Sequence, residues 1–162
     1  TRGKGVRWLV VGDGRASAWA REEVRRRGLD NCVVFLGQHP VDRMPSFFKH
    51  ADTLLVSLKD APIFAMTIPG KLQSYLAAGI PILAMLNGEG AGIVDAAEAG
   101  LSSPAGDGLA LANNAIRMAA MSKEDRQKMG ARGRTCYLEN FDRDMLISRL
   151  LEWLSQMRKV GI

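Results

Sequence analysis

Residues 68–86 read IPGKLQSYLAAGIPILAML and join a helix-forming stretch to a short apolar run. We expect the helix to begin at Gly70 and to end at Ala78, because Gly79 can adopt the left-handed conformation that stops a helix. The apolar run 80–86 has the length of a strand and falls far short of the roughly 20 residues that a membrane span needs. A helix followed directly by a buried strand is typical of an α/β protein.

The same alternation covers the rest of the chain. Strands are predicted at 7–11, 32–36, 53–57, 81–84 and 100–103. Helices are predicted at 16–27, 42–49, 70–78, 93–99 and 107–121, from a cap at Ser122 onward, and at 143–157. Strands that alternate with helices are joined by right-handed crossovers into a parallel sheet. The predicted fold is therefore a doubly wound, Rossmann-like α/β fold with C-terminal helices.

The composition agrees with one compact domain. The chain has 162 residues, of which 47% are apolar and 24% charged, and this is enough to bury a core. The net charge of +5 comes from both ends, because residues 1–27 hold eight basic and three acidic residues and residues 117–162 hold ten and six. Charge spread over two helical stretches, with only 6% aromatic residues, argues against nucleic acid as a partner. A solvated or membrane-facing surface accounts for it equally well.

The cysteines and histidines indicate neither a disulfide nor a metal site. Cys32 and Cys136 lie far apart, without CxxC spacing or a neighbouring histidine, which favours a reduced cytoplasmic protein. His39 and His50 have no carboxylate or cysteine at ligand spacing, so we expect no metal ion and no cofactor. His50 is interpreted as structural, whereas His39 follows a predicted strand and is a candidate ligand contact.

Ligands of a doubly wound sheet bind outside the carboxyl ends of its strands, so the loops that follow strands form the candidate site. Three of these loops contain glycine, at 12–14, 37–40 and 69–71. In the third loop, glycine lets backbone N–H groups approach a ligand, the helix dipole adds partial positive charge, and Lys71 adds a full one. This combination suits a phosphate or diphosphate. The alternative left open is that Gly70 only relieves a tight turn and Lys71 points into water.

Other patterns favour structural roles. The run 12–14 resembles the start of a dinucleotide fingerprint, but Ser17 stands where the third glycine is needed and no acidic residue follows at the required distance, so NAD is not expected. We find no Ser-His-Asp order and no paired-carboxylate spacing.

Several apolar side chains are interpreted as part of the core instead of a site, namely Phe47, Phe48 and Trp153. The last helix has one apolar face, which consists of Leu146, Leu150, Trp153, Leu154 and Met157.

Taken in order, the motifs of the chain are similar to those of a known family. They are WLVVGDG at 8–14, VFLG at 34–37, ADTLLVS at 51–57, IPGK at 68–71, YLAAGIP at 75–81, and KMG at 128–130 ahead of Tyr137 and Phe141. This set resembles the C-terminal donor-binding domain of retaining group 1 glycosyltransferases with the GT-B fold. It resembles most the bacterial enzymes that build O-antigen, capsule or exopolysaccharide. The similarity spans nearly the whole chain, as one half of a GT-B fold.

The resemblance implies a nucleotide-sugar donor, preferably a UDP-linked hexose or N-acetylhexosamine. The base would lie near Gly37, and the diphosphate would lie at the helix opened by Gly70, where Lys71 and the amides of Gly70 and Leu72 would stabilise the leaving group. The residues assigned to the nucleotide are Gly12, Asp13, Gly14, Gly37, Gln38, His39, Ile68, Pro69, Gly70, Lys71, Leu72 and Gln73. Those assigned to the donor sugar are Met66, Thr67 and Glu89.

The sequence departs from the family at two glutamates that bind the donor sugar and the ribose, because Met66 and Ser74 occupy their positions. Gln73 is the expected replacement at the ribose and Glu89 at the sugar. The family's basic residues from the first strand of the domain would lie before Thr1, as would its acceptor-binding N-terminal domain. We therefore expect 1–162 to be a donor-binding domain, slightly shortened at its N-terminus, which binds a nucleotide without transferring sugar alone.

The implied partners of the full enzyme are its own N-terminal domain and a lipid-linked or saccharide acceptor. Such an enzyme would act in the cytoplasm, with peripheral association at the inner face of the plasma membrane. Two other functions stay open. A non-catalytic nucleotide-binding α/β regulatory module would show an acidic phosphorylation or cofactor pocket at the strand ends. A GT-B-like UDP-sugar epimerase would need acid and base carboxylates or histidines in the cleft.

Overall fold

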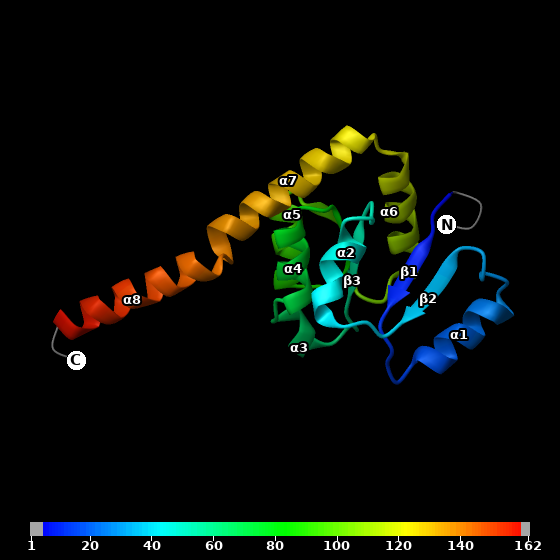
Figure 1. The fold of residues 1–162 in the computed structure, drawn as a ribbon, viewed down its shortest axis with the longest axis horizontal. Coiled ribbons are helices and arrows are strands. Elements are labelled where there is room, and N and C mark those ends of the chain that lie inside the picture. Colours follow the sequence, from blue (N-terminus) through cyan, green and yellow to red (C-terminus); the bar gives the residue numbers. More distant parts are fainter. Residues whose placement is uncertain (1–4, 160–162) are drawn as a thin grey trace.

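The computed structural model describes residues 5–159, and Figure 1 shows an α/β body from which a long C-terminal helix extends. The strands are β1 (Trp8–Val11), β2 (Val33–Gly37), β3 (Leu54–Ser57), β4 (Ile82–Met85) and β5 (Gly100–Ser103). The helices are α1 (Ser17–Arg26), the 3-10 turn η1 (Val41–Arg43), α2 (Met44–Phe48), α3 (Pro62–Ala65), α4 (Gly70–Ala78), α5 (Glu89–Ala96), α6 (Gly108–Ala120), α7 (Lys123–Asn140) and α8 (Arg143–Lys159). This order confirms the predicted α/β class.

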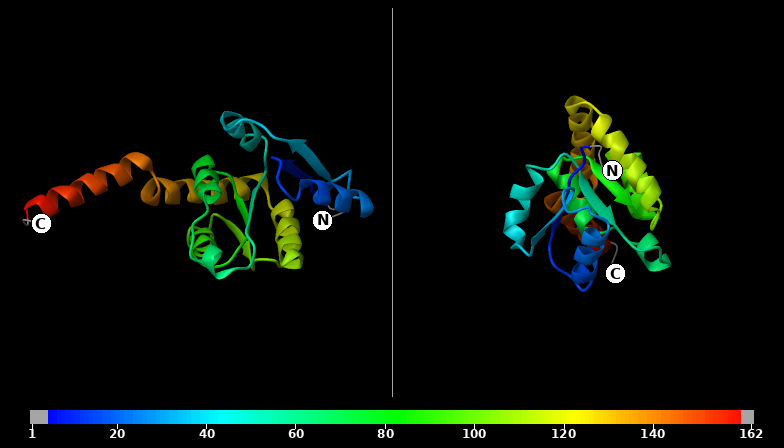
Figure 2. Two further views of the ribbon diagram at one scale, coloured as in Figure 1. Left: turned by 90° about the horizontal axis from the view of Figure 1, so that it is seen from below. Right: turned by 90° about the vertical axis from the view of Figure 1, so that its right-hand side faces the viewer.

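All strand pairs are parallel, but the strands form two sheets. β1 pairs with β2, and β4 lies between β3 and β5. Figure 2 shows the β1–β2 pair set apart from the three-stranded sheet. The close pairing of β4 with β5 requires Gly100, because a Cβ atom there would lie 1.9 Å from the carbonyl oxygen of Ile82.

The core covers both faces of the three-stranded sheet. The buried residues on one face, contributed by β3, β4, α4 and α5, include Val56, Leu72, Leu76, Ile82, Ala84 and Val94. Those on the other face, contributed by β4, α6 and α7, are Leu83, Ala115, Met118 and Met129. Parallel strands covered on both faces are apolar along their length, which explains the uninterrupted apolar runs of the sequence.

Basic residues of α7 bind the ends of neighbouring elements. Ser122 caps the helix as predicted, since its hydroxyl accepts a hydrogen bond from the N–H of Asp125 at 3.0 Å. Three arginines donate to backbone carbonyls in other segments, namely Arg126 to Met121 at 2.7 Å, Arg132 to Glu98 at 3.2 Å, and Arg134 to Ala77. Part of the positive charge of the C-terminal stretch therefore stabilises the fold rather than facing a partner.

Several local expectations are wrong. The helix predicted at 93–99 begins earlier and ends earlier, because α5 spans Glu89–Ala96. Between the strand predicted at 53–57 and the helix predicted at 70–78, the structure has a short helix that was not predicted, α3, whose first residue is a proline. The helix predicted at 42–49 is divided into η1, which contains Asp42 and has Pro40 as its N-cap, and α2.

The predicted last helix is present as α8, but its apolar face is not buried. Trp153, predicted to be a core residue, is 56% exposed, because α8 projects from the body at the end of α7 (Figure 1). Phe47 and Phe48 are half-buried, and Phe48 meets the ring of Tyr75 edge-on at 5.4 Å. Helical spacing of apolar residues identifies a face but does not say what covers it.

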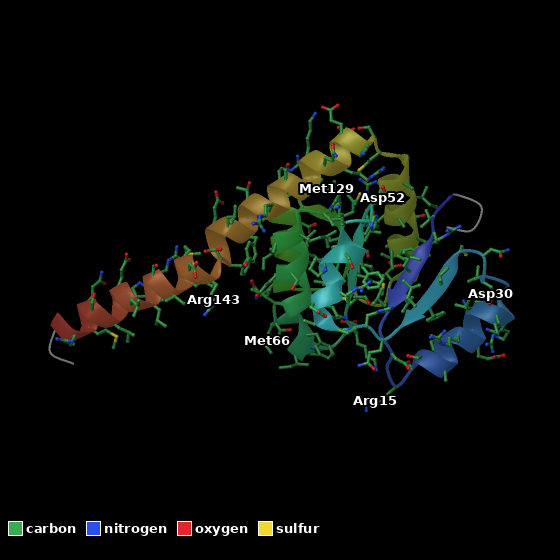
Figure 3. All side chains as sticks on the ribbon, in the orientation of Figure 1. Arg15, Asp30, Asp52, Met66, Met129 and Arg143 are labelled. Carbon is green, nitrogen blue, oxygen red and sulfur yellow. The ribbon has the colours of Figure 1, made fainter. Side chains whose placement is uncertain are left out.

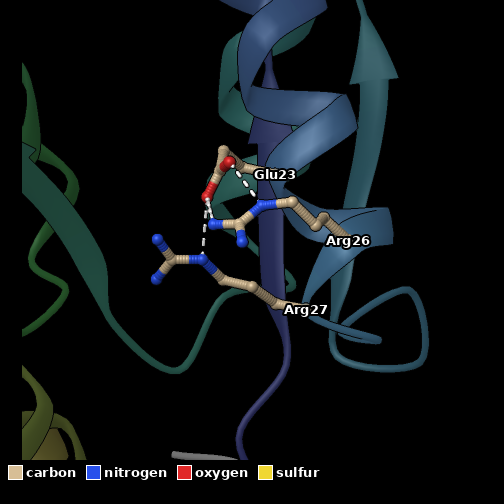
Figure 4. Close-up of polar contacts among 3 residues, drawn as sticks. All are labelled: Glu23, Arg26 and Arg27. Atoms are coloured by element: carbon tan, nitrogen blue, oxygen red, sulfur yellow. Dashed lines mark hydrogen bonds and ion pairs between the residues drawn. The ribbon is translucent and has the colours of Figure 1, made fainter.

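The exposed side of α1 carries a carboxylate held by two arginines (Figure 4). Glu23 accepts two hydrogen bonds from Arg26, both at 2.9 Å, and one from Arg27 at 2.8 Å. The two hydrogen bonds from Arg26, followed by the one from Arg27, lower the pKa of Glu23 from 4.5 to about 2. Hydrogen bonds to the charged form of a carboxylate favour that form.

We predict that the carboxyl group of Glu23 titrates near pH 2 in a carbon-detected NMR experiment. Because the pKa is lower in the folded chain, the stabilisation from this group is complete above about pH 4.5 and is lost as the pH falls toward 2. Arg26→Ala should raise the midpoint toward the ordinary value. A wild-type midpoint near 4.5 would show that the two arginines do not hold this carboxylate in solution.

Candidate functional site

The loops that follow β1 and β3 open at the same end of the molecule. In Figure 3, Arg15, which follows β1, and Met66, which lies between β3 and α4, are both at the lower end of the view. Asp52, which precedes β3, lies at the upper end. The lower end is therefore the carboxyl edge of the strands, where ligands of doubly wound folds bind.

The N-terminus of α4 presents backbone donors at this edge. Pro69 is the N-cap, with φ −61° and ψ 135°, and provides no side-chain hydrogen bond to the helix. The N–H of Leu72 donates to the carbonyl of Pro69 at 2.9 Å, and the Leu72 side chain is fully buried. The amide of Leu72, which was expected to face the ligand, is thus engaged within the helix. The amides of Gly70 and Lys71 come before the first turn closes and point forward from the helix end.

The Lys71 side chain stands in the first turn of α4 and is exposed. Among residues 5–159 it takes part in none of the ion pairs, all of which involve arginines or Lys128. A cation next to two forward-pointing amides adds a full charge to the partial positive charge of the helix dipole. This end of α4 is therefore suited to an anion.

Two glycines fix the position of the segment that leads into α4. Gly88 has φ +72°, and a Cβ atom on it would lie 1.9 Å from the carbonyl oxygen of Ala65 in α3. A Cβ on Gly90 would meet Leu86 at 2.8 Å and the ring of Pro69 at 3.4 Å. The turn after β4 is therefore in contact with both ends of the segment from α3 to the N-cap of α4.

Asn87 connects the loops that follow three neighbouring strands. Its amide group donates to the carboxylate of Asp60, after β3, at 3.0 Å. Its side-chain oxygen accepts a hydrogen bond at 3.0 Å from the N–H of Ala105, which follows β5. Neither Asn87 nor Asp60 was predicted from the sequence as a site residue. The available signal was their position, since each is a polar residue that closely follows an apolar strand.

The first two glycine loops lie side by side on the other sheet. The N–H of Gly12 donates to the carbonyl of Gly37 at 2.7 Å, and the N–H of Gly14 donates to the hydroxyl of Ser17 at 2.6 Å. Asp13 and Gln38 are exposed. Because the Gly12 and Gly14 amides already have partners, this pair of loops offers a ligand its side chains more than its backbone donors.

His39 is held within its own loop. Its Nε2 atom lies 3.2 Å from the carbonyl oxygen of Leu36, and its ring centroid lies 4.9 Å from that of Phe47. The imidazole remains exposed. A ring fixed in this way is positioned for stacking or hydrogen bonding to a ligand.

The residues assigned to the donor sugar flank the end of α4. Met66 is 70% exposed, and Thr67 turns its hydroxyl toward the carbonyl of Phe64 at 3.1 Å. Glu89 is exposed in the first turn of α5, next to Gly88. The structure therefore brings Glu89 and the segment 66–71 to one region through the contact of Gly88 with Ala65.

The residues assigned to the ribose differ in how freely they face a ligand. Gln73 is half-buried in the first turn of α4. The neighbouring Ser74 donates its hydroxyl proton to the carbonyl of Gly70 at 3.1 Å. This hydrogen bond commits Ser74 to the helix backbone, and Gln73 keeps its side-chain amide for other contacts.

The described residues include neither a cluster of metal-ligating side chains nor an activated thiol nucleophile. Within 5–159, no three histidine, cysteine or carboxylate side chains lie together as a metal site. Both cysteines are free thiols, and burial raises the pKa of Cys136 above its ordinary value, which favours the unreactive thiol.

None of the helices within residues 5–159 is both long and apolar enough to cross a bilayer.

A family comparison matches most of the chain. The family described as glycosyl transferases group 1 matches residues 1–121, from before β1 to the end of α6. No curated protein sequence matches the chain.

Solved structures share its fold. The HepE protein of Anabaena, crystallised with UDP, is 22% identical, with a TM-score of 0.77 over 93% of this chain and 41% of its own. Sucrose-phosphate synthase of Thermosynechococcus elongatus is 21% identical, with a TM-score of 0.77 over 94% of this chain and 39% of its own. A glycosyltransferase of Rickettsia africae is 16% identical, with a TM-score of 0.74 over 95% and 40%. The chain thus spans less than half the length of each.

Proposed function

Since the chain belongs to the glycosyl transferases of group 1, we propose that it is the domain that binds the nucleotide-sugar donor, with the diphosphate at the N-terminus of α4. The observation that carries this proposal is the combination of Lys71 with the amides of Gly70 and Lys71, at a helix end without a side-chain cap. The HepE structure, which shares the fold, contains UDP. We infer that the donor is a UDP-sugar carrying a hexose or an N-acetylhexosamine.

The proposed chemistry is stabilisation of a leaving group. When the bond between the sugar and the diphosphate breaks, the sugar gains oxocarbenium character and the diphosphate oxygens gain negative charge. Donors that are already oriented toward those oxygens stabilise this charge without reorganising. Lys71 supplies a full charge, and the amides and dipole of α4 supply partial charges. Transfer with retention of configuration is part of the proposal.

The other residues of the proposed site surround this anion position. The base lies against Gly37, Gln38 and His39, and Gln73 contacts the ribose. The sugar lies beside Met66, Thr67 and Glu89. In this proposal Gly12, Asp13 and Gly14 border the nucleotide, Asp13 through its side chain, and Ile68 and Pro69 form the wall that leads to α4. The support for grouping them is their shared place at the carboxyl edge of the strands.

We further propose that residues 1–162 form the donor half of a two-domain enzyme and do not transfer sugar alone. The other half would bind a lipid-linked or saccharide acceptor of bacterial polysaccharide synthesis. The enzyme would act in the cytoplasm, at the inner face of the plasma membrane. The support for the two-domain arrangement is that the chain covers 41% of the HepE structure and 39% of sucrose-phosphate synthase.

Calorimetric titration with UDP tests the diphosphate assignment. We expect saturable binding by the wild-type chain, and about ten- to hundred-fold weaker binding by Lys71→Met, the range that corresponds to one charge-assisted hydrogen bond. Methionine keeps the length of the side chain and removes the charge. The matched control is Lys49→Met, because Lys49 is also exposed but precedes β3, at the opposite edge of the strands.

The contradicting results are equally specific. Absence of saturable binding of UDP by the wild-type chain would contradict the nucleotide-binding role. Equal affinities of the wild type and Lys71→Met would contradict the placement of the diphosphate at α4. A similar loss of affinity in both lysine variants would indicate a general effect of positive charge instead of a site.

A further inference from the structure

The segment that leads from β3 into α4 has little buried surface to hold it in place. It spans residues 59–69, and none of the residues of α3 in its middle is buried. Ile63 and Met66 are 60% and 70% exposed. A segment with few buried apolar contacts opens locally at a low cost in free energy. The position of this segment therefore depends on a small number of specific contacts.

The two ends of the segment are held differently. At the α4 end, Pro69 faces the turn after β4, where a Cβ atom on Gly90 would lie 3.4 Å from its ring, and the neighbouring Leu72 is fully buried. At the β3 end, the side-chain amide of Asn87 donates to the carboxylate of Asp60 at 3.0 Å. Packing thus fixes the α4 end, whereas a side-chain hydrogen bond ties the other end to the turn after β4.

Hydrogen bonds between the backbones of neighbouring strands stop before these loops. The last ones run from the N–H of Leu58 to the carbonyl of Met85 at 3.0 Å and from the N–H of Leu86 to that of Ser103 at 3.2 Å. Past them, within residues 5–159, the hydrogen bonds that join the loops after β3, β4 and β5 are the two made by the side chain of Asn87. Both polar atoms of this amide are therefore engaged, which fixes its orientation.

We propose that Asn87 is a positioning residue for the sugar of the nucleotide-sugar donor, an inference that rests on the proposed function. The segment that Asn87 ties down carries Met66 and Thr67, which the proposed function places beside the sugar. The close approach of Gly88 to Ala65, in the middle of the segment, also depends on Asn87, because Gly88 follows it in the same turn.

Loss of the hydrogen bond to Asp60 should affect binding of the sugar more than binding of UDP. A hydrogen bond to a carboxylate is stronger than one between neutral groups, so its removal lets the segment leave its position for a larger share of the time. The affinity for a ligand falls in proportion to the share of molecules that keep the binding position. The proposed diphosphate contacts of Gly70 and Lys71 belong to α4, which Leu72 and Leu76 anchor in the core. These contacts persist when the segment moves.

Calorimetric titrations with UDP, UDP-glucose and UDP-N-acetylglucosamine test the proposal. We expect Asn87→Ala to bind the UDP-sugar that the wild type prefers about tenfold more weakly than the wild type does, and to bind UDP less than about threefold more weakly. Asp60→Ala should show the same pattern. The variant with both substitutions should be no weaker than either single variant, since all three lack the same hydrogen bond.

The matched control is Asn114→Ala. Asn114 likewise donates one side-chain hydrogen bond, to the carbonyl of Ser102 at 2.7 Å, and accepts one, from Arg117 at 3.1 Å, but it lies inside α6. This variant should lose stability and keep its affinities for UDP and for the UDP-sugar.

An exchange of the two side chains should restore the hydrogen bond with its direction reversed. In the double variant Asp60→Asn/Asn87→Asp, the amide at position 60 would donate to the carboxylate at position 87, whose second oxygen would accept from the N–H of Ala105. We expect its affinity for the UDP-sugar to lie within about threefold of the wild-type affinity. Asn87→Asp alone places two carboxylates together and should bind the UDP-sugar at least about tenfold more weakly.

Three results would overturn the proposal. One is an equal loss of affinity for UDP and for the UDP-sugar in Asn87→Ala. The second is an unchanged affinity for the UDP-sugar in Asp60→Ala, which replaces an exposed residue and should fold even if Asn87→Ala does not. The third is a double variant Asp60→Asn/Asn87→Asp that binds the UDP-sugar as weakly as Asn87→Asp.

Failure of the proposed function is a separate result, namely absence of UDP binding by the wild type. Hydrogen exchange then still tests whether the bond between Asn87 and Asp60 positions the segment. The amide of Phe64 donates to the carbonyl of Ala61 at 3.0 Å. It should exchange at least about tenfold faster in Asp60→Ala than in the wild type, and equal rates would contradict a positioning role.

Discussion

Gly130→Ala is expected to destabilise the chain by about 3 kcal/mol, at the upper end of the range for overpacking. Gly130 lies where α7 crosses the end of α4, and a Cβ atom on it would lie 2.1 Å from the carbonyl oxygen of Gly79 and 2.8 Å from its carbonyl carbon. Both atoms belong to the backbone and cannot rotate away. The two helices must therefore separate, which exposes the buried side of Leu76 and Met129.

Urea denaturation followed by circular dichroism measures this effect. The control is Gly92→Ala, because Gly92 also lies inside a helix, α5, but a Cβ atom there has no neighbour within 4 Å. Alanine at that position should be neutral or should stabilise the chain by about 0.5–1 kcal/mol. If Gly130→Ala unfolds at the same urea concentration as Gly92→Ala, the close approach of α7 to α4 does not exist in solution.

Gly88→Ala is expected to weaken binding of UDP by at least about tenfold, which corresponds to about 1.4 kcal/mol. The added Cβ would overlap the carbonyl oxygen of Ala65 at 1.9 Å, so the segment from α3 to Pro69 must move away from the turn after β4. That segment sets where α4 begins and where Lys71 stands. Stability should also fall, because Gly88 has φ +72° and ψ −143°, a region open essentially to glycine alone, which costs a residue with a side chain on the order of 1–3 kcal/mol.

Gly106→Ala separates these two effects. Gly106 has φ +81° but no neighbour within 4 Å of its added Cβ, so this variant should lose stability through backbone strain and keep its affinity for UDP. Calorimetry and urea denaturation on both variants provide the comparison. Equal affinities of Gly88→Ala and Gly106→Ala for UDP would show that the position of the segment 65–69 does not control the site.

The local features of the fold could be predicted from the sequence. Gly79 ends α4 with φ +68°, and Ser122 caps α7, because both depend on a few consecutive residues. The helix α4 itself has the predicted bounds. These elements are determined by helix propensity, capping and the length of apolar runs, which are properties of neighbouring residues.

Features that depend on distant residues could not be predicted in the same way. The helix predicted at 93–99 begins at Glu89 instead, where a Cβ atom on Gly90 would lie 3.4 Å from the ring of the distant residue Pro69. Asn87 bridges Asp60 and Ala105, which lie 27 and 18 residues away. The exposure of Trp153 follows from the direction in which α8 leaves the body, which no periodicity records.

Part of the candidate site could likewise be predicted from neighbouring residues, and part of it could not. The N-terminus of α4 was visible in the sequence because glycine, lysine and a helix start are adjacent in the chain. The engagement of the Leu72 amide by Pro69, and of the Gly14 amide by Ser17, required coordinates. These hydrogen bonds narrow the backbone donors of the proposed diphosphate site to the amides of Gly70 and Lys71.

An NMR titration of the ¹⁵N-labelled chain with UDP, and in parallel with uridine, tests whether the start of α4 holds a diphosphate. We predict that the amide signals of Gly70 and Lys71 shift with saturation as UDP is added, and remain nearly unchanged with uridine, which has the base and ribose but no phosphate. Shifts with UDP that leave these two amides unmoved, or equal shifts with uridine, would contradict the account.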